Sequence, residues 1–327
     1  VCMLFVFILA ISGYMSIRAT NYLPVRIAIE TKDALHQYKE YGKAKAQREA
    51  RLQQLQGLKI TSEGGIFVSE TRDHMGAYGY DRDTTPWMTE EAQKPEAILF
   101  QNAYSNHTHT VPVLTYALSE KNQYNDVPLE KAYSLIEIAK AAGYDTFWLS
   151  NQRKYGAWDT PVAEIASTAV HQAWLNERTG THDLRSDYYD DALVQALPDL
   201  TNEKNALIVI HLMGCHGSYA DRYPEEWKHY SGKSDVIDKY DNAIRYNDYV
   251  LQQLYEALKE NPRFKGFVYF SDHGEDVEHN YGHEASKFTA TMSHIPLFMV
   301  VSPSFQAERP QTVETLRSHR DSYWTNL

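Results

Sequence analysis

The feature that most constrains the fold of this 327-residue chain is a repeated pattern, in which a short apolar stretch ends at an acidic residue or a histidine. The pattern occurs three times: Glu70 follows the stretch 65–68, His211 follows 206–210, and the pair Asp272 and His273 follows 266–270. Such stretches are typical of strands buried in a parallel sheet. Open α/β sheets bind ligands at the carboxyl ends of their strands, where a buried charge must be paired or bound to a metal. We therefore expect these side chains to meet at one edge of a sheet.

Strand-like and helix-like segments alternate along most of the chain. The expected strands are residues 65–68, 97–100, 144–149, 206–210, 267–270 and 295–301, and the expected helices are 111–118, 129–142 and 236–258. This alternation predicts an α/β fold with a mostly parallel, doubly wound sheet flanked by helices.

The N-terminal part differs from the rest. Residues 1–17 are almost wholly apolar, and they lack the basic leader and the cleavage site of a signal peptide. We interpret residues 1–18 as the end of a membrane-anchoring transmembrane helix, with a buried core helix as the alternative. Residues 19–61 are predicted to form a polar linker helix, and residues 62–327 the catalytic domain. Four residues of the linker are expected to dock on that domain: Leu35, Tyr38, Leu52 and Leu55.

Charge and cysteine content exclude some classes of protein. The net charge of −11 argues against nucleic acid as a partner. The two cysteines, Cys2 and Cys215, lie far apart in the sequence, so we expect no structural disulfide and no cysteine-based zinc site.

Several of the residues at the predicted sheet edge are potential metal ligands. Glu70, Asp272 and His273 offer two carboxylates and an imidazole, which suit zinc, or manganese if oxygen ligands dominate. A salt-bridged cluster without metal is the alternative. Three further histidines could bind a second metal or phosphate oxygens: His211, His216 and His283.

The segment 104–114 carries hydroxyl groups between a predicted strand and a predicted helix. Thr110 lies at the start of that helix, where the positive field of the helix N-terminus favours an anion. A threonine hydroxyl bound to a cation can act as a nucleophile. Simple helix capping by Thr110 is the alternative, and Thr108 is the other threonine in the segment. Asn106 is a candidate substrate-binding residue.

Asn151 and Lys154 follow another predicted strand. An amide and a cation at a strand end could hold a phosphate or a substrate head group. A solvated loop explains the same residues equally well.

Together, these residues resemble the alkaline phosphatase superfamily, and within it the bacterial phosphoethanolamine transferases. Four blocks carry the resemblance: SETRDH at 69–74 with YGYDRDTTP at 78–86, TVPVLTYALS at 110–119, HLMGCHG at 211–217 with RYP at 222–224, and SDHGE at 271–275 followed by His283. Ser69 stands where glycine is usual in the family. The resemblance implies that both ends of the chain are truncated, because the family has membrane spans before this domain and a longer C-terminal part.

The resemblance also implies a two-step reaction. Thr110, bound to zinc through Glu70, Asp272 and His273, would attack phosphatidylethanolamine, and the phosphoethanolamine would then pass to lipopolysaccharide core, lipid A or another envelope acceptor. His216 and His283, with His211 nearby, would bind a second zinc ion or the phosphoryl oxygens. The implied cofactor is one or two Zn²⁺ ions, with Mn²⁺ possible. The implied location is the bacterial inner membrane, with the catalytic domain in the periplasm.

Two relatives of this chemistry are alternatives. A phosphoglycerol transferase or a phosphatase-like or sulfatase-like hydrolase would share the fold. A formylglycine sulfatase requires a Cys-x-Pro-x-Arg type motif, and none occurs at the expected nucleophile position.

Overall fold

The computed structural model describes residues 23–53, 65–68, 70–154, 160–176, 188–200 and 205–327. Its centre is a seven-stranded sheet with the order β2-β8-β7-β1-β6-β4-β5. The strands are β1 (Gly65–Val68), β2 (Ala97–Leu99), β4 (Asp145–Arg153), β5 (His171–Asn176), β6 (Ala206–His211), β7 (Gly266–Ser271) and β8 (Leu297–Val301). The neighbours β7, β1, β6, β4 and β5 are parallel, and β8 runs antiparallel to both β7 and β2. A second sheet pairs β3 (Asn102–Tyr104) with β9 (Tyr323–Thr325).

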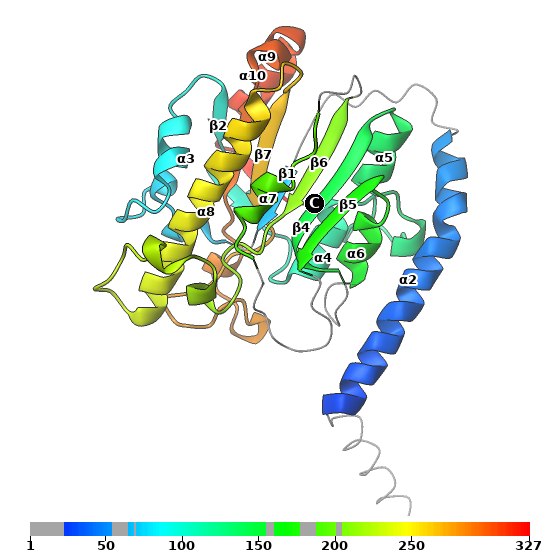
Figure 1. Cartoon of the computed structure of the whole chain (residues 1–327), viewed down its shortest axis with the longest axis horizontal. Coiled ribbons are helices and arrows are strands. Elements are labelled where there is room, and N and C mark those ends of the chain that lie inside the picture. Colours follow the sequence, from blue (N-terminus) through cyan, green and yellow to red (C-terminus); the bar gives the residue numbers. More distant parts are fainter. Residues whose placement is uncertain (1–22, 54–64, 69, 155–159, 177–187, 201–204) are drawn as a thin grey trace, which may run out of the picture.

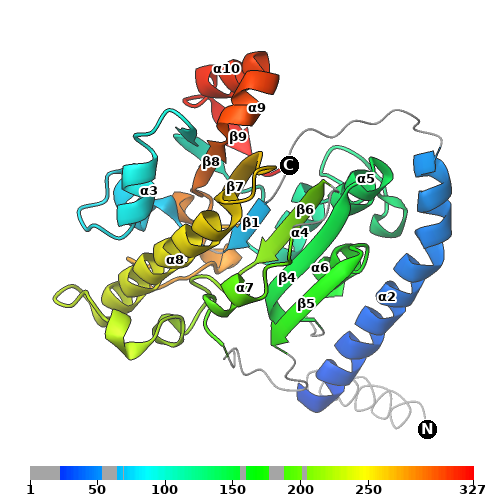
Figure 2. The ribbon, with the colours of Figure 1, turned by 45° about the horizontal axis from the view of Figure 1, so that its top comes forward.

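Helices cover both faces of the large sheet (Figures 1 and 2). One face carries α3 (Pro86–Glu91), α7 (Ala192–Gln195) and α8 (Asp235–Lys259), and the other carries α4 (Thr110–Ala117), α5 (Leu135–Ala141) and α6 (Thr160–Ala166). Two short helices, α9 (Pro303–Glu308) and α10 (Pro310–Ser318), pack near β8. The predicted doubly wound α/β fold is therefore confirmed.

Successive residues of strand β6, which lies next to the central strand β1, show how the two faces are built. Leu207 and Val209 pack into a core formed with α4, α5 and α6, whereas Ile208 and Ile210 pack into a core formed with α3, α7 and α8. Side chains of a strand alternate between the two faces of its sheet. Because both sets are apolar, the strand is buried on both sides, as expected for a parallel strand.

Most predicted elements differ by one or two residues at their ends, and two differ by more. The helix predicted over 129–142 begins at Leu135, because Ser134 and Glu137 form a capping box that sets the helix start there. The preceding residues form a separate 3₁₀ turn, η3 (Leu129–Lys131). Strand β4 continues to Arg153, four residues beyond the predicted end. Its continuation pairs Ser150 with His211 of β6.

The predicted linker contains a long helix, α2 (Leu23–Gln53), which packs against η3, α5 and α6. Leu52 is buried, as predicted, but Leu35 is exposed, so its predicted docking role is wrong. The docking instead depends on Arg48, which contacts Glu137 of α5 and has a side chain that is only 1% exposed. Helix formers alone could not predict a buried arginine at this position.

Several predictions concern residues that the structure does not describe. The predicted transmembrane segment 1–18, the boundary region 57–62, and Leu55 lie outside the described residues. Among the described helices, none is both long enough and apolar enough to cross a membrane.

Candidate active site

The carboxyl ends of three adjacent strands bring the candidate residues to one edge of the sheet. The register places Val68 of β1 beside Ser271 of β7, and Phe67 of β1 beside His211 of β6. The chain segments that carry Glu70 and Asp272 leave the sheet at this same edge. The convergence expected from the sequence pattern is thus confirmed.

Asp272, His273 and Thr110 form the centre of the site. His273 Nδ1 lies 3.0 Å from the carbonyl oxygen of Gly274, which can only accept a hydrogen bond, so Nδ1 carries the proton. The other ring nitrogen is Nε2, on the opposite side of the ring. This nitrogen lies 3.4 Å from Thr110 Oγ1 and 3.6 Å from Asp272 Oδ2. The Asp272 and His273 side chains are almost completely buried.

Thr110 is the first residue of α4, and it does not act as the cap. The N-cap of α4 is His109, which makes no capping hydrogen bond with its side chain. The Thr110 hydroxyl is directed at His273 instead. The Thr108 hydroxyl is 3.0 Å from His109 Nδ1. Of the two hydroxyls considered from the sequence, the structure therefore brings Thr110 to the imidazole of the site.

A second group of side chains lies beside this centre. His273, Glu275 and His283 each offer a ligand atom, and these atoms all lie within 4.8 Å of one another. Glu275 Oε1 is 2.6 Å from His283 Nδ1, and Glu275 Oε2 accepts a hydrogen bond of 2.7 Å from Tyr219 Oη. The hydrogen bond to Glu275 raises the pKa of His283 despite the opposing effect of burial. The His109 ring lies 5.4 Å from the His283 ring.

Glu70 lies deeper than the other acidic residues of the site. Cys215 Sγ donates a hydrogen bond of 3.0 Å to Glu70 Oε1, and Tyr269 Oη donates one of 2.5 Å to Oε2. Burial raises the pKa of Glu70 to about 8, although both hydrogen bonds oppose the shift. Ser271 Oγ connects this residue to the rest of the site, since it accepts from the Glu70 backbone N–H and donates to the His273 carbonyl. The role of Glu70 as a metal ligand stays a prediction.

The other two predicted histidines occupy different places. The His216 ring lies 6.2 Å from that of His283, and His216 Nδ1 is buried with no hydrogen-bond partner among the described residues. His211 Nδ1 instead lies 3.2 Å from Ser150 Oγ, and its ring packs edge-on against Trp148. Burial lowers the pKa of both His211 and His216 to about 4, so both imidazoles are neutral at pH 7.

The three predicted substrate-binding residues have structural contacts. Asn151 Nδ2 donates hydrogen bonds of 2.8 Å to Asp190 Oδ1 and 3.0 Å to the Tyr188 carbonyl. Lys154 Nζ lies 5.9 Å from the centre of the Trp174 ring. Asn106 contacts the C-terminal part of the chain, as described below. A substrate-binding role for these three residues stays a prediction.

Some residues of the site were not predicted. Glu275 lies inside the SDHGE block, two residues after His273. Its position in this block could have predicted that it belongs to the site. Asp190 accepts hydrogen bonds from the backbone N–H groups of Met213 and Gly214, and so holds the loop that leads to His216. No local sequence signal distinguishes Asp190, because its partners lie more than twenty residues away.

The side chains of this site fit a zinc ion. Zinc binds imidazole nitrogen and carboxylate oxygen, usually with four ligands. His273, Glu275 and His283 supply such donors within reach of one another, and Asp272 is adjacent. The neutral His216 ring, whose buried Nδ1 has no partner within the described part of the chain, supplies a further nitrogen that a cation or a phosphoryl group would satisfy.

A profile of the sulfatase family matches residues 66–327. The chain belongs to the sulfatase family. It is 32% identical, over 268 residues, to phosphoethanolamine transferase EptC of Escherichia coli K12, an alignment that covers 75% of this chain and 46% of that protein. It is 33% identical over 238 residues to the putative transferase YhbX of the same strain, with 71% and 41% covered. The chain thus spans about half the length of the curated relatives that it matches.

Solved structures of sulfatase-family relatives have the same fold. The C-terminal periplasmic domain of EptC from E. coli, in complex with zinc, superposes with a TM-score of 0.69 at 29% identity, covering 82% of this chain and 80% of that one. The integral membrane lipooligosaccharide phosphoethanolamine transferase A from Neisseria meningitidis gives a TM-score of 0.65 at 18% identity, with 99% and 65% covered. The second likeness shows the fold alone.

Proposed function

We propose that this chain carries the catalytic domain of a phosphoethanolamine transferase. The donor would be phosphatidylethanolamine, and the acceptor a cell-envelope molecule such as lipopolysaccharide core or lipid A. The observation that carries the proposal is the Thr110 hydroxyl at the N-terminus of α4, 3.4 Å from His273 Nε2 and beside Asp272. The names of the curated relatives and the zinc complex of the E. coli domain support it.

The proposed cofactor is zinc, as one or two ions, and manganese is the alternative. Asp272 and His273 would hold the first ion together with Thr110 and Glu70. His216 and His283 would hold a second ion or the phosphoryl oxygens, with Glu275 orienting His283. When bound, zinc would lower the pKa of a coordinated hydroxyl and stabilise negative charge on the reacting oxygens.

The proposed reaction has two displacements at one phosphorus atom. In the first, Thr110 Oγ1 attacks the phosphorus, the bond from phosphorus to the glycerol oxygen breaks, and diacylglycerol leaves with the proton that Thr110 gives up. The phosphoethanolamine group is then esterified to Thr110. In the second, an acceptor oxygen attacks the same phosphorus, the bond from phosphorus to Thr110 Oγ1 breaks, and Thr110 takes up the proton that the acceptor gives up. The buried Asp272-His273 pair keeps the orientation of Thr110 constant through both steps.

The proposed location is the bacterial inner membrane, with this domain in the periplasm. The apolar composition of residues 1–17 supports a membrane anchor. The E. coli relative is described as a periplasmic domain and the N. meningitidis relative as an integral membrane protein. A lipid donor is consistent with attachment to a membrane.

The experiment compares Thr110→Ala with Thr108→Ala in the full chain. We expect Thr110→Ala to lower the release of diacylglycerol from phosphatidylethanolamine by about 1,000-fold or more, because the nucleophile is lost. Thr108→Ala removes a nearby hydroxyl that does not contact His273, so it should retain activity within about threefold. Mass spectrometry should detect the phosphoethanolamine adduct on the peptide of Thr110 in the unmodified protein.

Other outcomes would redirect the proposal. Equal activity of Thr110→Ala and the unmodified protein would exclude Thr110 as the nucleophile. Turnover of phosphatidylglycerol in place of phosphatidylethanolamine would indicate a phosphoglycerol transferase. Release of free phosphoethanolamine without transfer would indicate a hydrolase.

A further inference from the structure

The C-terminal strand lies next to the loop that leads to Thr110. Strand β9 pairs in parallel with β3, with Thr325 beside Tyr104. Trp324 fixes this strand by packing edge-on against the buried ring of Phe100, at 5.0 Å between ring centres. The next residue, Asn326, therefore emerges beside the loop between β3 and α4, which connects Tyr104 to Thr110.

The side chain of Asn326 connects this loop to the strand end that carries Asp272. Its Oδ1 accepts a hydrogen bond of 3.0 Å from the backbone N–H of Asn106. Its Nδ2 donates one of 3.0 Å to the backbone carbonyl of Asp272 and lies 3.4 Å from Ser105 Oγ. The Asn106 side chain reinforces the contact, because its Nδ2 donates to the backbone carbonyl of Asn326 at 3.1 Å.

We propose that Asn326 is a positioning residue that sets Thr110 relative to Asp272. The inference rests on the proposed function, in which Thr110 and Asp272 would hold the same metal ion and Thr110 would attack the phosphorus. The geometry has a simple chemical basis. An amide has one acceptor and one donor end, and here each end holds the backbone of a different catalytic segment. Thr110 and Asp272 are 162 positions apart in the sequence, and Asn326 holds their two segments together through a single side chain.

This chemistry distinguishes between possible replacements. Asn326→Ala removes both ends of the connection. Asn326→Asp keeps the acceptor for Asn106 but places a carboxylate oxygen against the Asp272 carbonyl, so the donor end is lost and repulsion replaces it. Thr325→Ala is the matched control, since Thr325 is the neighbouring residue of the same strand and its side chain is exposed.

The experiment measures four quantities for each variant of the full chain. These are kcat and KM for transfer from phosphatidylethanolamine vesicles, the zinc dissociation constant from chelator competition with the metal alone, and the melting temperature. We expect both Asn326 variants to lower kcat about 10-fold or more and to weaken zinc binding by a similar factor, the range typical of residues that orient metal ligands. KM should change less than about twofold, and Thr325→Ala should resemble the unmodified protein in all four measurements.

Each contrary result identifies a different error. If the Asn326 variants have the kcat and zinc affinity of Thr325→Ala, the positioning role is refuted. If kcat falls only in proportion to the loss of folded protein, Asn326 stabilises the fold and does not position the site. If the unmodified protein transfers nothing, the proposed function fails, and the comparison of zinc affinities alone then decides whether Asn326 positions the site.

Discussion

The buried contact between Arg48 of α2 and Glu137 of α5 offers a sharp test of how the helix is attached to the domain. Both side chains are 1% exposed, and Arg48 Nε lies 2.9 and 3.1 Å from the two carboxylate oxygens of Glu137. Arg48 Nη1 also donates to the backbone carbonyls of Tyr41 and Glu130, at 3.1 and 2.6 Å. The guanidinium lies 3.8 Å from the centre of the Tyr41 ring.

The expected effect of Arg48→Ala follows from what it leaves behind. The Glu137 carboxylate would stay buried without its ion-pair partner. It would keep the hydrogen bond that it accepts from the backbone N–H of Ser134 in the capping box. Breaking a buried ion pair by removing one partner costs about 3 to 5 kcal/mol. We therefore expect Arg48→Ala to lower the free energy of unfolding by about 4 kcal/mol. The double variant Arg48→Met/Glu137→Gln removes both charges, so it should lose at least about 2 kcal/mol less than the sum of its single variants.

Urea unfolding followed by circular dichroism measures these differences. Lys45→Ala is the matched control, because Lys45 also lies on α2 but forms an exposed pair with Glu49 at 3.9 Å. Exposed pairs contribute about 1 kcal/mol or less, so the control should change stability little. A loss below about 1 kcal/mol for Arg48→Ala, or strictly additive effects in the double variant, would falsify the assignment of Arg48 as the main anchor of α2.

Two further predictions concern the site and the α2 interface. Gly274→Ala should destabilise the fold by about 1 to 3 kcal/mol, because a methyl group there would collide with the backbone carbonyl of Thr291. Gly217→Ala is the control, since a methyl group at that position meets open space and should leave the melting temperature unchanged. Equal melting temperatures would contradict this reasoning. Burial, together with the nearby Glu130 carboxylate, raises the pKa of Glu164 from 4.5 to about 7, so the folded protein binds a proton that the unfolded chain has lost. The free energy of unfolding should therefore fall as the pH rises through this window. In urea titrations between about pH 5 and pH 8, Glu164→Gln should reduce the dependence of this free energy on pH. The same pH dependence in the variant and the unmodified protein would contradict the prediction.

The parts of the fold that could be predicted from the sequence depend on local patterns. Apolar stretches of four to six residues identified most strands of the large sheet, because a buried parallel strand is apolar on both faces. The ligand-type residues after them then predicted the edge at which Asp272 and His273 lie. The short strand β3 was not predicted, since its sequence Asn-Ala-Tyr has no apolar run and its pairing with β9 is parallel and distant in sequence.

The parts of the site that could not be predicted depend on contacts between distant segments. Asn326, Tyr219 and Asp190 are ordinary polar residues in the sequence, and each acquires its role only through a partner that the fold brings to it. The same holds for Cys215, whose contact with Glu70 spans 145 positions. Local patterns identify candidate ligand-binding residues, whereas residues whose partners are distant in the sequence require the three-dimensional structure.

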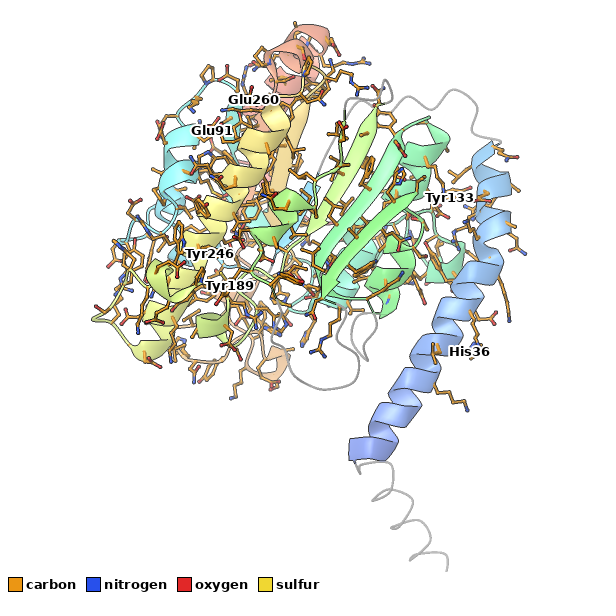
Figure 3. All side chains as sticks on the ribbon, in the orientation of Figure 1. His36, Glu91, Tyr133, Tyr189, Tyr246 and Glu260 are labelled. Carbon is orange, nitrogen blue, oxygen red and sulfur yellow. The ribbon has the colours of Figure 1, made fainter. Side chains whose placement is uncertain are left out.

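The position of the buried side chains along α2 has a geometric consequence. The described buried side chains of this helix, Tyr41, Arg48 and Leu52, all lie in its C-terminal half, whereas His36, labelled in Figure 3, is exposed. Among the described side chains, the buried contacts of α2 therefore begin at Tyr41. From Tyr41 to Leu23 the helix extends about 27 Å at a rise of 1.5 Å per residue. Each residue inserted between Leu23 and Tyr41 would therefore lengthen this part of the helix by about 1.5 Å and rotate its end by about 100°.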